Sequence, residues 1–242
     1  MVVIEMVLEG TIINVLAIIV GGIIGSFLSN IPNRIRVTVM QGLGLAVVIQ
    51  GIAMGLKTDN FLLVIVSVVL GGIIGEILKI DGKLDNVGKW IEGRVGKKSK
   101  GNISTAFVTA TLVYTIGAMA ILGALNSGLN NDHSLLYLKS MLDGFSAIIF
   151  ASTLGVGVVF SAIPVFLYQG LIAISAKYIH FLVSPELLDA IILEITATGG
   201  ILIIAIAINI LDLKKINVAN LLPAIVIAPL GVVLLDWLSK FL

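Results

Sequence analysis

Long charge-poor windows recur along the chain, separated by short clusters of charged residues. A helix that crosses the roughly 30 Å hydrocarbon core of a bilayer needs about 20 mostly apolar residues. Eight windows of this size cover residues 10–29, 36–56, 60–79, 103–126, 140–161, 164–183, 191–211 and 218–239. The pattern predicts an all-α fold, a polytopic transmembrane helical bundle of about eight spans.

The division between the fifth and sixth windows is the least distinct. Residues 144–176 carry no charge, and only the stretch 161–164 marks a turn. Seven spans, or a re-entrant pair, therefore also fit the pattern. Residues that weaken helices gather in 141–164, among them Ser146, Ser152 and Thr153. Because broken backbone in a bilayer needs protein or water to satisfy it, we expect a broken helix here that lines a path or a site.

Composition supports a membrane protein and narrows its partners. The chain is 58% hydrophobic and 12% charged, about half the charge of a typical soluble domain. The 26 glycines favour close helix packing, and the absence of cysteine excludes disulfides and thiolate metal sites. A formal net charge of +1 gives no reason to expect a nucleic-acid partner. We expect one membrane domain over 1–242, with the lipid bilayer as its main partner.

The basic residues predict an orientation. Assigning the loops alternately to the two sides places 11 of the 15 Lys and Arg residues on one side, which is then cytoplasmic. Both termini should then face outside. If the fifth and sixth windows form one span instead, the basic residues still divide 11 to 4 between the two sides. The longest polar segment, 79–100, has apolar residues three and four apart between its charges, as expected for an amphipathic helix on the cytoplasmic membrane face that connects the halves. A plain solvated linker is the alternative.

Three sequence echoes suggest internal repeats. VGGIIG at 20–25 matches LGGIIG at 70–75, and Thr-Ala-Thr occurs at 109–111 and 196–198. AIIFA at 147–151 and AIVIA at 224–228 are each followed by Leu-Gly-Val. The last two echoes relate the fourth and fifth windows to the seventh and eighth, which would cross the membrane in opposite directions, as in inverted-topology transporters. Chance matches in so biased a composition are the alternative.

The glycine echo has a structural interpretation. Gly21 and Gly25, and likewise Gly71 and Gly75, stand four residues apart on one helical face. This spacing lets two helix backbones approach closely. We expect these glycines to hold the first and third spans together.

Hydroxyl and proline residues are candidates for a substrate or ion path. Thr109, Thr111, Thr196 and Thr198 lie near the starts of their windows, where freed N–H groups of a broken helix could bind a solute. The alternative is a hydroxyl bonded to a carbonyl one turn back.

Pro223 and Pro229 each remove a backbone donor from the eighth window and leave a carbonyl that could bind a cation, unless neighbours repair the kink. We expect both to face Ser146, Ser152 and Thr153 across a shared cavity.

Acids inside a membrane indicate function by default. Asp143 and Glu194 each adjoin a repeat motif on the predicted outer side, so either could carry a proton or bind Na⁺. Glu76 and Asp236 lie at window ends, where reaching the interface is the simpler interpretation. No HExxH, GxSxG, phosphate-binding loop or metal cluster occurs. We therefore expect neither an enzyme, nor a metal site, nor a cofactor.

Several longer motifs together resemble a known family. They are GTIINVLAIIVGGIIG, GGIIGEILKIDGKLDNVGKWIE, FVTATLVYTIGAMAILGAL, KSMLDGFSAIIFASTLGVGVVFSA, ITATGG and NLLPAIVIAP. The chain resembles, over nearly its whole length, the bacterial integral membrane family called domain of unknown function 554. The resemblance implies an inner-membrane protein that looks like a transporter, with no agreed substrate and no catalytic residues to carry over.

The sequence thus predicts a secondary transporter or channel for a small solute or ion, with windows four, five, seven and eight as its core. Alternating access around a midplane site would move the solute, and a homo-oligomer is compatible with this class. The alternative is a membrane scaffold or regulator that transports nothing and docks partners on 79–100. An uninterrupted fifth span and a core without a polar cavity would favour the scaffold.

Overall fold

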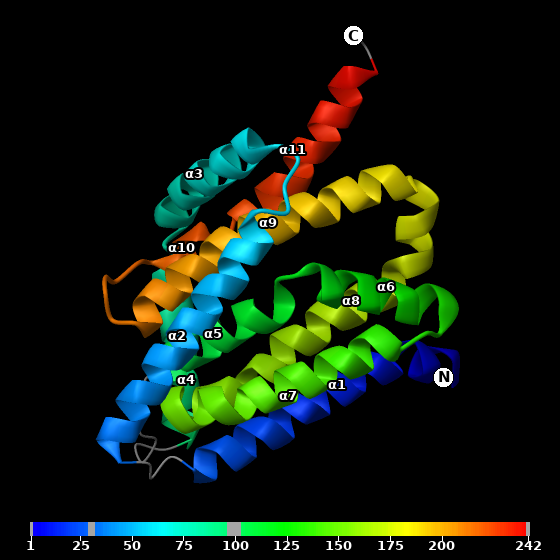
Figure 1. Ribbon diagram of the computed structural model, residues 1–242. Coiled ribbons are helices and arrows are strands. Elements are labelled where there is room, and N and C mark those ends of the chain that lie inside the picture. Colours follow the sequence, from blue (N-terminus) through cyan, green and yellow to red (C-terminus); the bar gives the residue numbers. More distant parts are fainter. Residues whose placement is uncertain (1, 29–31, 96–102, 241–242) are drawn as a thin grey trace. The chain divides into compact units, whose positions relative to one another are not determined.

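The computed structural model describes residues 2–28, 32–95 and 103–240, and in these ranges the chain is helical and contains no strand (Figure 1). This confirms the all-α prediction. The helices are α1 (Val2–Phe27), α2 (Asn33–Gly55), α3 (Phe61–Leu78), α4 (Ile80–Val95), α5 (Ile103–Thr115), α6 (Ala118–Asn130), α7 (Ser134–Leu154), the 3₁₀ helix η1 (Val156–Ser161), α8 (Ala162–Leu182), α9 (Pro185–Ile210), α10 (Val218–Leu221) and α11 (Ala224–Ser239).

The chain is shared between two compact units. Unit 1 contains residues 1–36, 85–115 and 119–182, and unit 2 contains 37–84, 116–118 and 183–242. In unit 1, α1 packs against α7, α8 and η1, and α5 packs against α7, α8 and η1. In unit 2, α3 and α9 both pack against α10 and α11. The single membrane domain expected over 1–242 stays a prediction.

Seven segments of the described chain are long and apolar enough to cross a membrane. They are Val7–Phe27, Val37–Gly55, Phe61–Leu78, Ser134–Leu154, Val156–Leu182, Pro185–Ile210 and Val218–Ser239. The bent pair α5 and α6 makes an eighth if it counts as one span. The predicted count of about eight spans, with seven as the alternative, is confirmed.

The turn between the fifth and sixth spans lies earlier than the sequence suggested. Helix α7 ends at Leu154, and Gly155 takes the left-handed φ of 107° that a glycine adopts most easily. Pro164 falls in the first turn of α8, where the absent N–H has no intrahelical partner to lose. The segment 141–164 is therefore the second half of one helix, a turn and the start of the next. Its prediction as one crossing that turns at 161–164 is wrong.

The fourth window forms a bent helix pair, either one broken span or a re-entrant loop. Helices α5 and α6 meet at an angle of 61°, and between them Gly117 has a φ of 140°. Gly117 is one of two glycines in a window that also carries several hydroxyl residues, and the sequence did not single it out as a break. The three residues 116–118 belong to unit 2, whereas α5 and nearly all of α6 belong to unit 1.

The paired glycines lie at close helix contacts, but with other partners than expected. A Cβ atom on Gly21 would collide with the carbonyl oxygen of Gly144 in α7. In unit 2, a Cβ on Gly75 would collide with the carbonyl oxygen of Asn220 in α10. Gly21 and Gly25 thus contact α7, while Gly71 and Gly75 contact the α10–α11 segment, so the expected pairing of the first span with the third is wrong.

We call these two glycine-lined helix contacts seams, one between α1 and α7 and one between α3 and the α10–α11 segment, and the helices run in the same direction in the first and in opposite directions in the second. Gly21 meets Gly144 and Gly25 meets Ile148, so α1 and α7 are parallel, and they lie side by side in Figure 1. In unit 2, α3 runs antiparallel to the α10–α11 segment, because its successive contacts run backwards along the partner, pairing Leu63 with Gly231, Gly71 with Ala224 and Gly75 with Asn220.

The polar segment 79–100 begins as a helix of its own. Lys79 has a left-handed φ of 51° that separates α3 from α4, and α4 then runs to Val95. Residues 96–100 lie outside the described residues. The cytoplasmic and membrane-surface placement of this segment stays a prediction.

Candidate solute-binding cavity

Helix α9 begins with a strong local start signal. The Ser184 hydroxyl accepts a hydrogen bond from the Leu187 N–H (3.3 Å), Pro185 occupies the first helical position and Glu186 lies in the first turn. The helix therefore begins before the apolar window at 191–211. Glu194 consequently lies in the third turn of α9, inside the span rather than at its edge.

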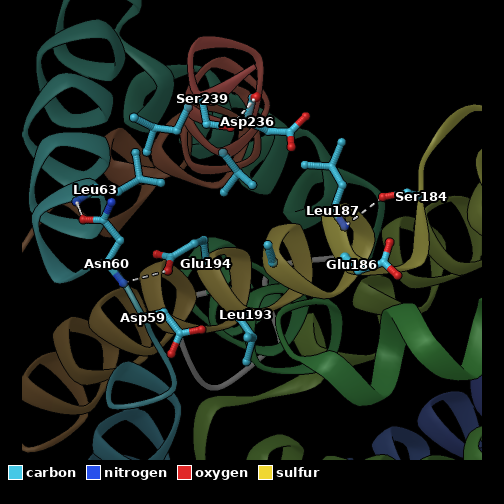
Figure 2. Close-up of a pocket in the computed structure, with 13 residues that line it drawn as sticks. Asp59, Asn60, Leu63, Ser184, Glu186, Leu187, Leu193, Glu194, Asp236 and Ser239 are labelled. Carbon is cyan, nitrogen blue, oxygen red and sulfur yellow. Dashed lines mark hydrogen bonds between the residues drawn. The ribbon is translucent and has the colours of Figure 1, made fainter. Parts of the chain in front are cut away.

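A cavity of about 360 Å³ lies in unit 2, beside the first half of α9 (Figure 2). Its walls come from the α2–α3 loop, the start of α3, the first half of α9 and the last turns of α11. The lining residues are Asp59, Asn60, Leu63, Ser184, Glu186, Leu187, Ala190, Leu193, Glu194, Val232, Leu235, Asp236 and Ser239.

Glu194 is the buried acid of this cavity, with 4% of its surface exposed. Its Oε1 accepts a hydrogen bond from the Thr58 hydroxyl (2.6 Å) and a longer one from the Asn60 N–H (3.3 Å). Asn60 is itself fixed, because its side chain caps α3 by accepting from the Leu63 N–H (3.1 Å). The start of α3 thus positions the donors that hold one oxygen of Glu194.

The other carboxylate oxygen of Glu194 is buried and has no hydrogen-bond partner among the described residues. Burying an ionised carboxylate costs several kcal/mol unless a counter-charge or hydrogen bonds compensate. The two donors on Oε1 supply only part of this compensation. A bound cation or a proton at Oε2 would supply the rest.

The cavity carries four carboxyl groups, and none of its described lining residues is Lys, Arg or His. Asp59 and Glu186 are exposed at the rim, whereas Asp236 is part-buried and forms an ion pair with Lys240 (2.7 Å). Glu186 and Glu194 are eight residues apart on α9, which corresponds to about 12 Å along the axis. The negative charge is therefore spread along the cavity, from its opening to the buried Glu194.

This spread argues against direct chelation of a metal ion. Within the described part of the chain, no three His, Cys, Asp or Glu side chains lie close enough together to hold one. A cavity of about 360 Å³ lies within the usual range for small-molecule sites, roughly 300–1,000 Å³. The geometry suits a cation of several atoms better than a bare ion.

Unit 1 buries the second predicted acid in a different environment. Asp143 and Lys139 are 6% and 7% exposed, and the Lys139 Nζ lies 3.0 Å from Oδ1 and 2.9 Å from Oδ2 of Asp143. The Asn14 Nδ2 donates to Asp143 Oδ2 (3.1 Å) and to Gln169 Oε1 (3.2 Å). Sequence reasoning placed Lys139 in an outer loop, although its spacing of four residues from Asp143 is the signal of a helical ion pair.

The remaining hydroxyl candidates divide into two groups. Ser146, Ser152 and Thr153 each donate to a carbonyl of their own helix three or four residues back. The hydroxyls of three other threonines are buried without a partner in the described residues, namely Thr111, Thr196 and Thr198. Thr109 is buried in α5.

The helix starts expected near the threonines do not exist. Thr196 and Thr198 lie in the middle of the unbroken helix α9, and Thr109 and Thr111 lie in the middle of α5. No backbone N–H is freed there, because each has a carbonyl one turn back within the helix. No helix N-terminus lies beside these residues, and whether their hydroxyls line a solute path stays a prediction.

The two prolines occupy different positions in the eighth span. Pro223 is the N-cap of α11, and its carbonyl accepts from the N–H groups of Val226 and Ile227 (3.0 Å each). Pro229 lies inside α11. Both prolines belong to unit 2, whereas the hydroxyls at 146, 152 and 153 belong to unit 1. That the two groups share a cavity stays a prediction.

Comparison with known proteins finds relatives along almost the whole chain. The family model described as "Protein of unknown function (DUF554)" matches residues 9–233. The chain is 35% identical over 225 residues to the uncharacterized membrane protein YdfK of Bacillus subtilis (strain 168), covering 91% of this chain and 93% of the relative. It is 32% identical over 236 residues to the uncharacterized protein YqgA of Escherichia coli (strain K12), covering 95% and 99%. No solved structure matches.

Proposed function

Because the chain belongs to the DUF554 family of proteins of unknown function, we propose its function from the site itself: this multi-pass membrane protein transports a small organic cation, which binds in the cavity of unit 2. The proposal keeps the predicted class, a secondary transporter for a small solute, and names the charge of that solute.

Glu194 is the single observation that carries the proposal. It combines deep burial, one oxygen fixed by Thr58 and Asn60, and a second oxygen without a partner in a cavity. A structural acid at this depth would be expected to satisfy both oxygens. A buried acid that lines a cavity and has one unpartnered oxygen is a candidate binding group.

The walls of the cavity favour an organic cation over other solutes. Four carboxyls and no lining base repel anions at every depth. The aliphatic surfaces of Leu63, Leu187 and Val232 can cover methyl or methylene groups, and each buried methylene contributes about 0.8 kcal/mol. An ammonium group near Glu194 with an alkyl body against these walls would use both features.

Under the predicted orientation, the cavity opens on the outer side of the membrane. The loop at 57–60, the start of α9 and the end of α11 all fall on the outer side of the basic-residue assignment. A solute would therefore enter from outside and compete with a proton for Glu194, which is the simplest route to proton coupling. Of the two features expected for the scaffold alternative, the uninterrupted helix α7 agrees with it, whereas the cavity weighs against it.

Thermal unfolding of the purified protein with defined probes tests binding. Choline and 1,4-diaminobutane should raise the midpoint of unfolding, whereas glucose and acetate should not. A ligand at 100 times its Kd stabilises the folded state by about 2.7 kcal/mol. Glu194→Gln should abolish the shift. Asp189→Asn, the same kind of charge removal at an exposed position on α9 outside the cavity lining, should retain it.

Uptake separates a transporter from a binding protein. Proteoliposomes with the wild-type protein should accumulate the radiolabelled probe that shifts the unfolding midpoint, and Glu194→Gln proteoliposomes should not. Equal shifts in both variants, or a shift without uptake, would overturn the proposal.

A further inference from the structure

We propose that Asn14, Lys139, Asp143 and Gln169 form a proton-binding site in unit 1, in which the Asn14 and Gln169 amides reverse together when Asp143 takes up a proton. The four residues come from α1, α7 and α8, and each is at least nine-tenths buried. The site is separate from the cavity of unit 2 and does not rest on the transport proposal.

The present hydrogen bonds suit an ionised Asp143. Lys139 donates to Oδ1 and forms an ion pair with Oδ2, and the Asn14 Nδ2 donates to Oδ2. The same Nδ2 also donates to the Gln169 Oε1. Every bond that reaches Asp143 from these neighbours therefore brings a hydrogen to it, which favours the charged carboxylate.

Two amide atoms of the cluster have no hydrogen-bond partner within the described residues. They are the Asn14 Oδ1 and the Gln169 Nε2, and both are buried. An unpaired buried donor or acceptor costs about 1–3 kcal/mol. Because the far end of each amide makes no hydrogen bond with the described residues, either amide can reverse without breaking a bond at that end.

Reversing both amides gives a second arrangement. At present the Asn14 Nδ2 contacts both Asp143 and Gln169. After both amides reverse, the Asn14 Oδ1 occupies the place of Nδ2, and the Gln169 Nε2 occupies the place of Oε1. The Asn14 oxygen then accepts from a protonated Asp143 Oδ2 and from Gln169 Nε2. The two atoms now unpartnered are those that the protonated state uses.

The proton balance is simple. One proton from the aqueous phase adds to Oδ2 of Asp143, and only this O–H bond forms. The Oδ1 atom remains the acceptor for Lys139, which keeps its ammonium group, so the cluster changes from neutral to a charge of +1. The whole event needs rotation of two side-chain amides and no movement of a helix.

The groups around Asp143 are Lys139 on its own helix, Asn14 on α1 with Gln169 of α8 behind it, and the Tyr114 hydroxyl of α5 within electrostatic reach. At the start of α7, the exposed Glu9 accepts a hydrogen bond from the Tyr137 hydroxyl (2.7 Å).

Infrared difference spectroscopy of the reconstituted protein during a pH titration tests the site without any substrate. Acidification, within the range where far-UV circular dichroism is unchanged, should produce the C=O stretch of a protonated carboxylic acid and, at the same pH, a change in a side-chain amide band. Asp143→Asn should remove the carboxyl band, and Asn14→Leu should remove the amide change. Glu194→Gln should leave both in place.

Lys139→Met should move the carboxyl band to higher pH, because the ionised form loses its counter-charge. If Asp143→Asn fails to fold, the neutral pair variant Lys139→Met/Asp143→Asn serves as the band control. The absence of a carboxyl band that depends on Asp143 would overturn the proposal. A carboxyl band without the Asn14-dependent amide change would overturn the reversal of the amides. Neither result bears on cation binding at Glu194.

Discussion

Unit 1 and unit 2 each bury one acid inside a membrane-spanning helix, yet the two acids have opposite surroundings. Asp143 has a lysine one turn away on its own helix and an asparagine from α1. Glu194 has only a hydroxyl and a backbone N–H on one oxygen, its other oxygen has no partner among the described residues, and the residue lines a cavity.

The difference shows how a membrane protein can give similar residues separate tasks. An acid whose charge is balanced by a lysine on the same helix attracts an external cation only weakly, but it can still exchange a proton. An acid without a counter-charge must obtain one from a ligand or a proton. In the two proposals, the lysine rather than the acid therefore decides which ligand each site accepts.

Removing the lysine should give the largest effect. Lys139→Met leaves the Asp143 charge buried without its partner, which should lower the free energy of unfolding by about 3–5 kcal/mol at neutral pH. Glu194→Gln removes a buried charge that has no ionic partner in the described residues and should cost no more than about 1 kcal/mol. Denaturant titration in detergent micelles, followed by circular dichroism, measures both.

The pair variant Lys139→Met/Asp143→Asn provides the control. It removes both charges together and should recover most of the lost stability. The cost of Lys139→Met should also shrink on acidification, because Asp143 then takes up a proton. If Lys139→Met costs no more than Glu194→Gln, the contrast between the two sites is wrong.

The glycine seams make a second comparison between the units. Both place a Gly-x-x-x-Gly face against a segment with the AIxxA sequence, but α1 runs parallel to α7 and α3 runs antiparallel to the α10–α11 segment. A symmetry operation preserves the relative direction of two helices within a pair. These two pairs are therefore not symmetry-related copies, and the matching glycines reflect a common packing solution.

Adding one methyl group to a seam should have an intermediate effect. Gly21→Ala and Gly75→Ala each place a Cβ against a facing backbone carbonyl, so each should lower the free energy of unfolding by about 1–3 kcal/mol. Gly42→Ala is the matched control in α2, because a Cβ there would meet nothing within 4 Å. It should be neutral or stabilising by about 0.5–1 kcal/mol, and equal effects at all three positions would contradict the seam assignment.

The fold was largely readable from the sequence, because apolar windows of membrane length report directly on spans. The breaks were readable only in part. A break was expected within 141–164, and the bend at Gly155 lies there, whereas the sequence did not single out Gly117. Only the surrounding tertiary contacts decide which of the 26 glycines leave helical geometry. Ser146, Ser152 and Thr153 suggested a break, but their hydroxyls bond to their own helix.

The site was readable only in part. The sequence identified Asp143 and Glu194 because an acid is conspicuous in an apolar window. It did not reveal Thr58 or Asn60, because both lie more than 130 residues from Glu194 along the chain. It misplaced Lys139, because a basic residue close to the end of a window resembles a loop residue. Burial and pairing depend on the neighbouring helices, and no local pattern reports them.

The starts of the two long helices offer the smallest and most specific contrast. A carboxylate serves the start of α7: Asp132 accepts from the Ser134 hydroxyl (2.7 Å) and N–H (3.0 Å), and these bonds lower the pKa of Asp132. The start of α9 uses the neutral hydroxyl of Ser184. The capping group of α7 is therefore titratable, and that of α9 is not.

Hydrogen exchange at the first turns of α7 and α9 should resolve this contrast. Since the folded-state pKa of Asp132 lies below its unfolded value of about 3.9, its stabilisation is present above that value and is lost as the pH falls through the folded pKa. Asp132→Ala should accelerate exchange at the start of α7 at neutral pH, and its difference from the wild type should vanish on strong acidification. Ser184→Ala should lower stability by about 1 kcal/mol equally at both pH values. A cost of Asp132→Ala that does not change with pH would mean that the carboxylate charge has no part in holding the start of α7.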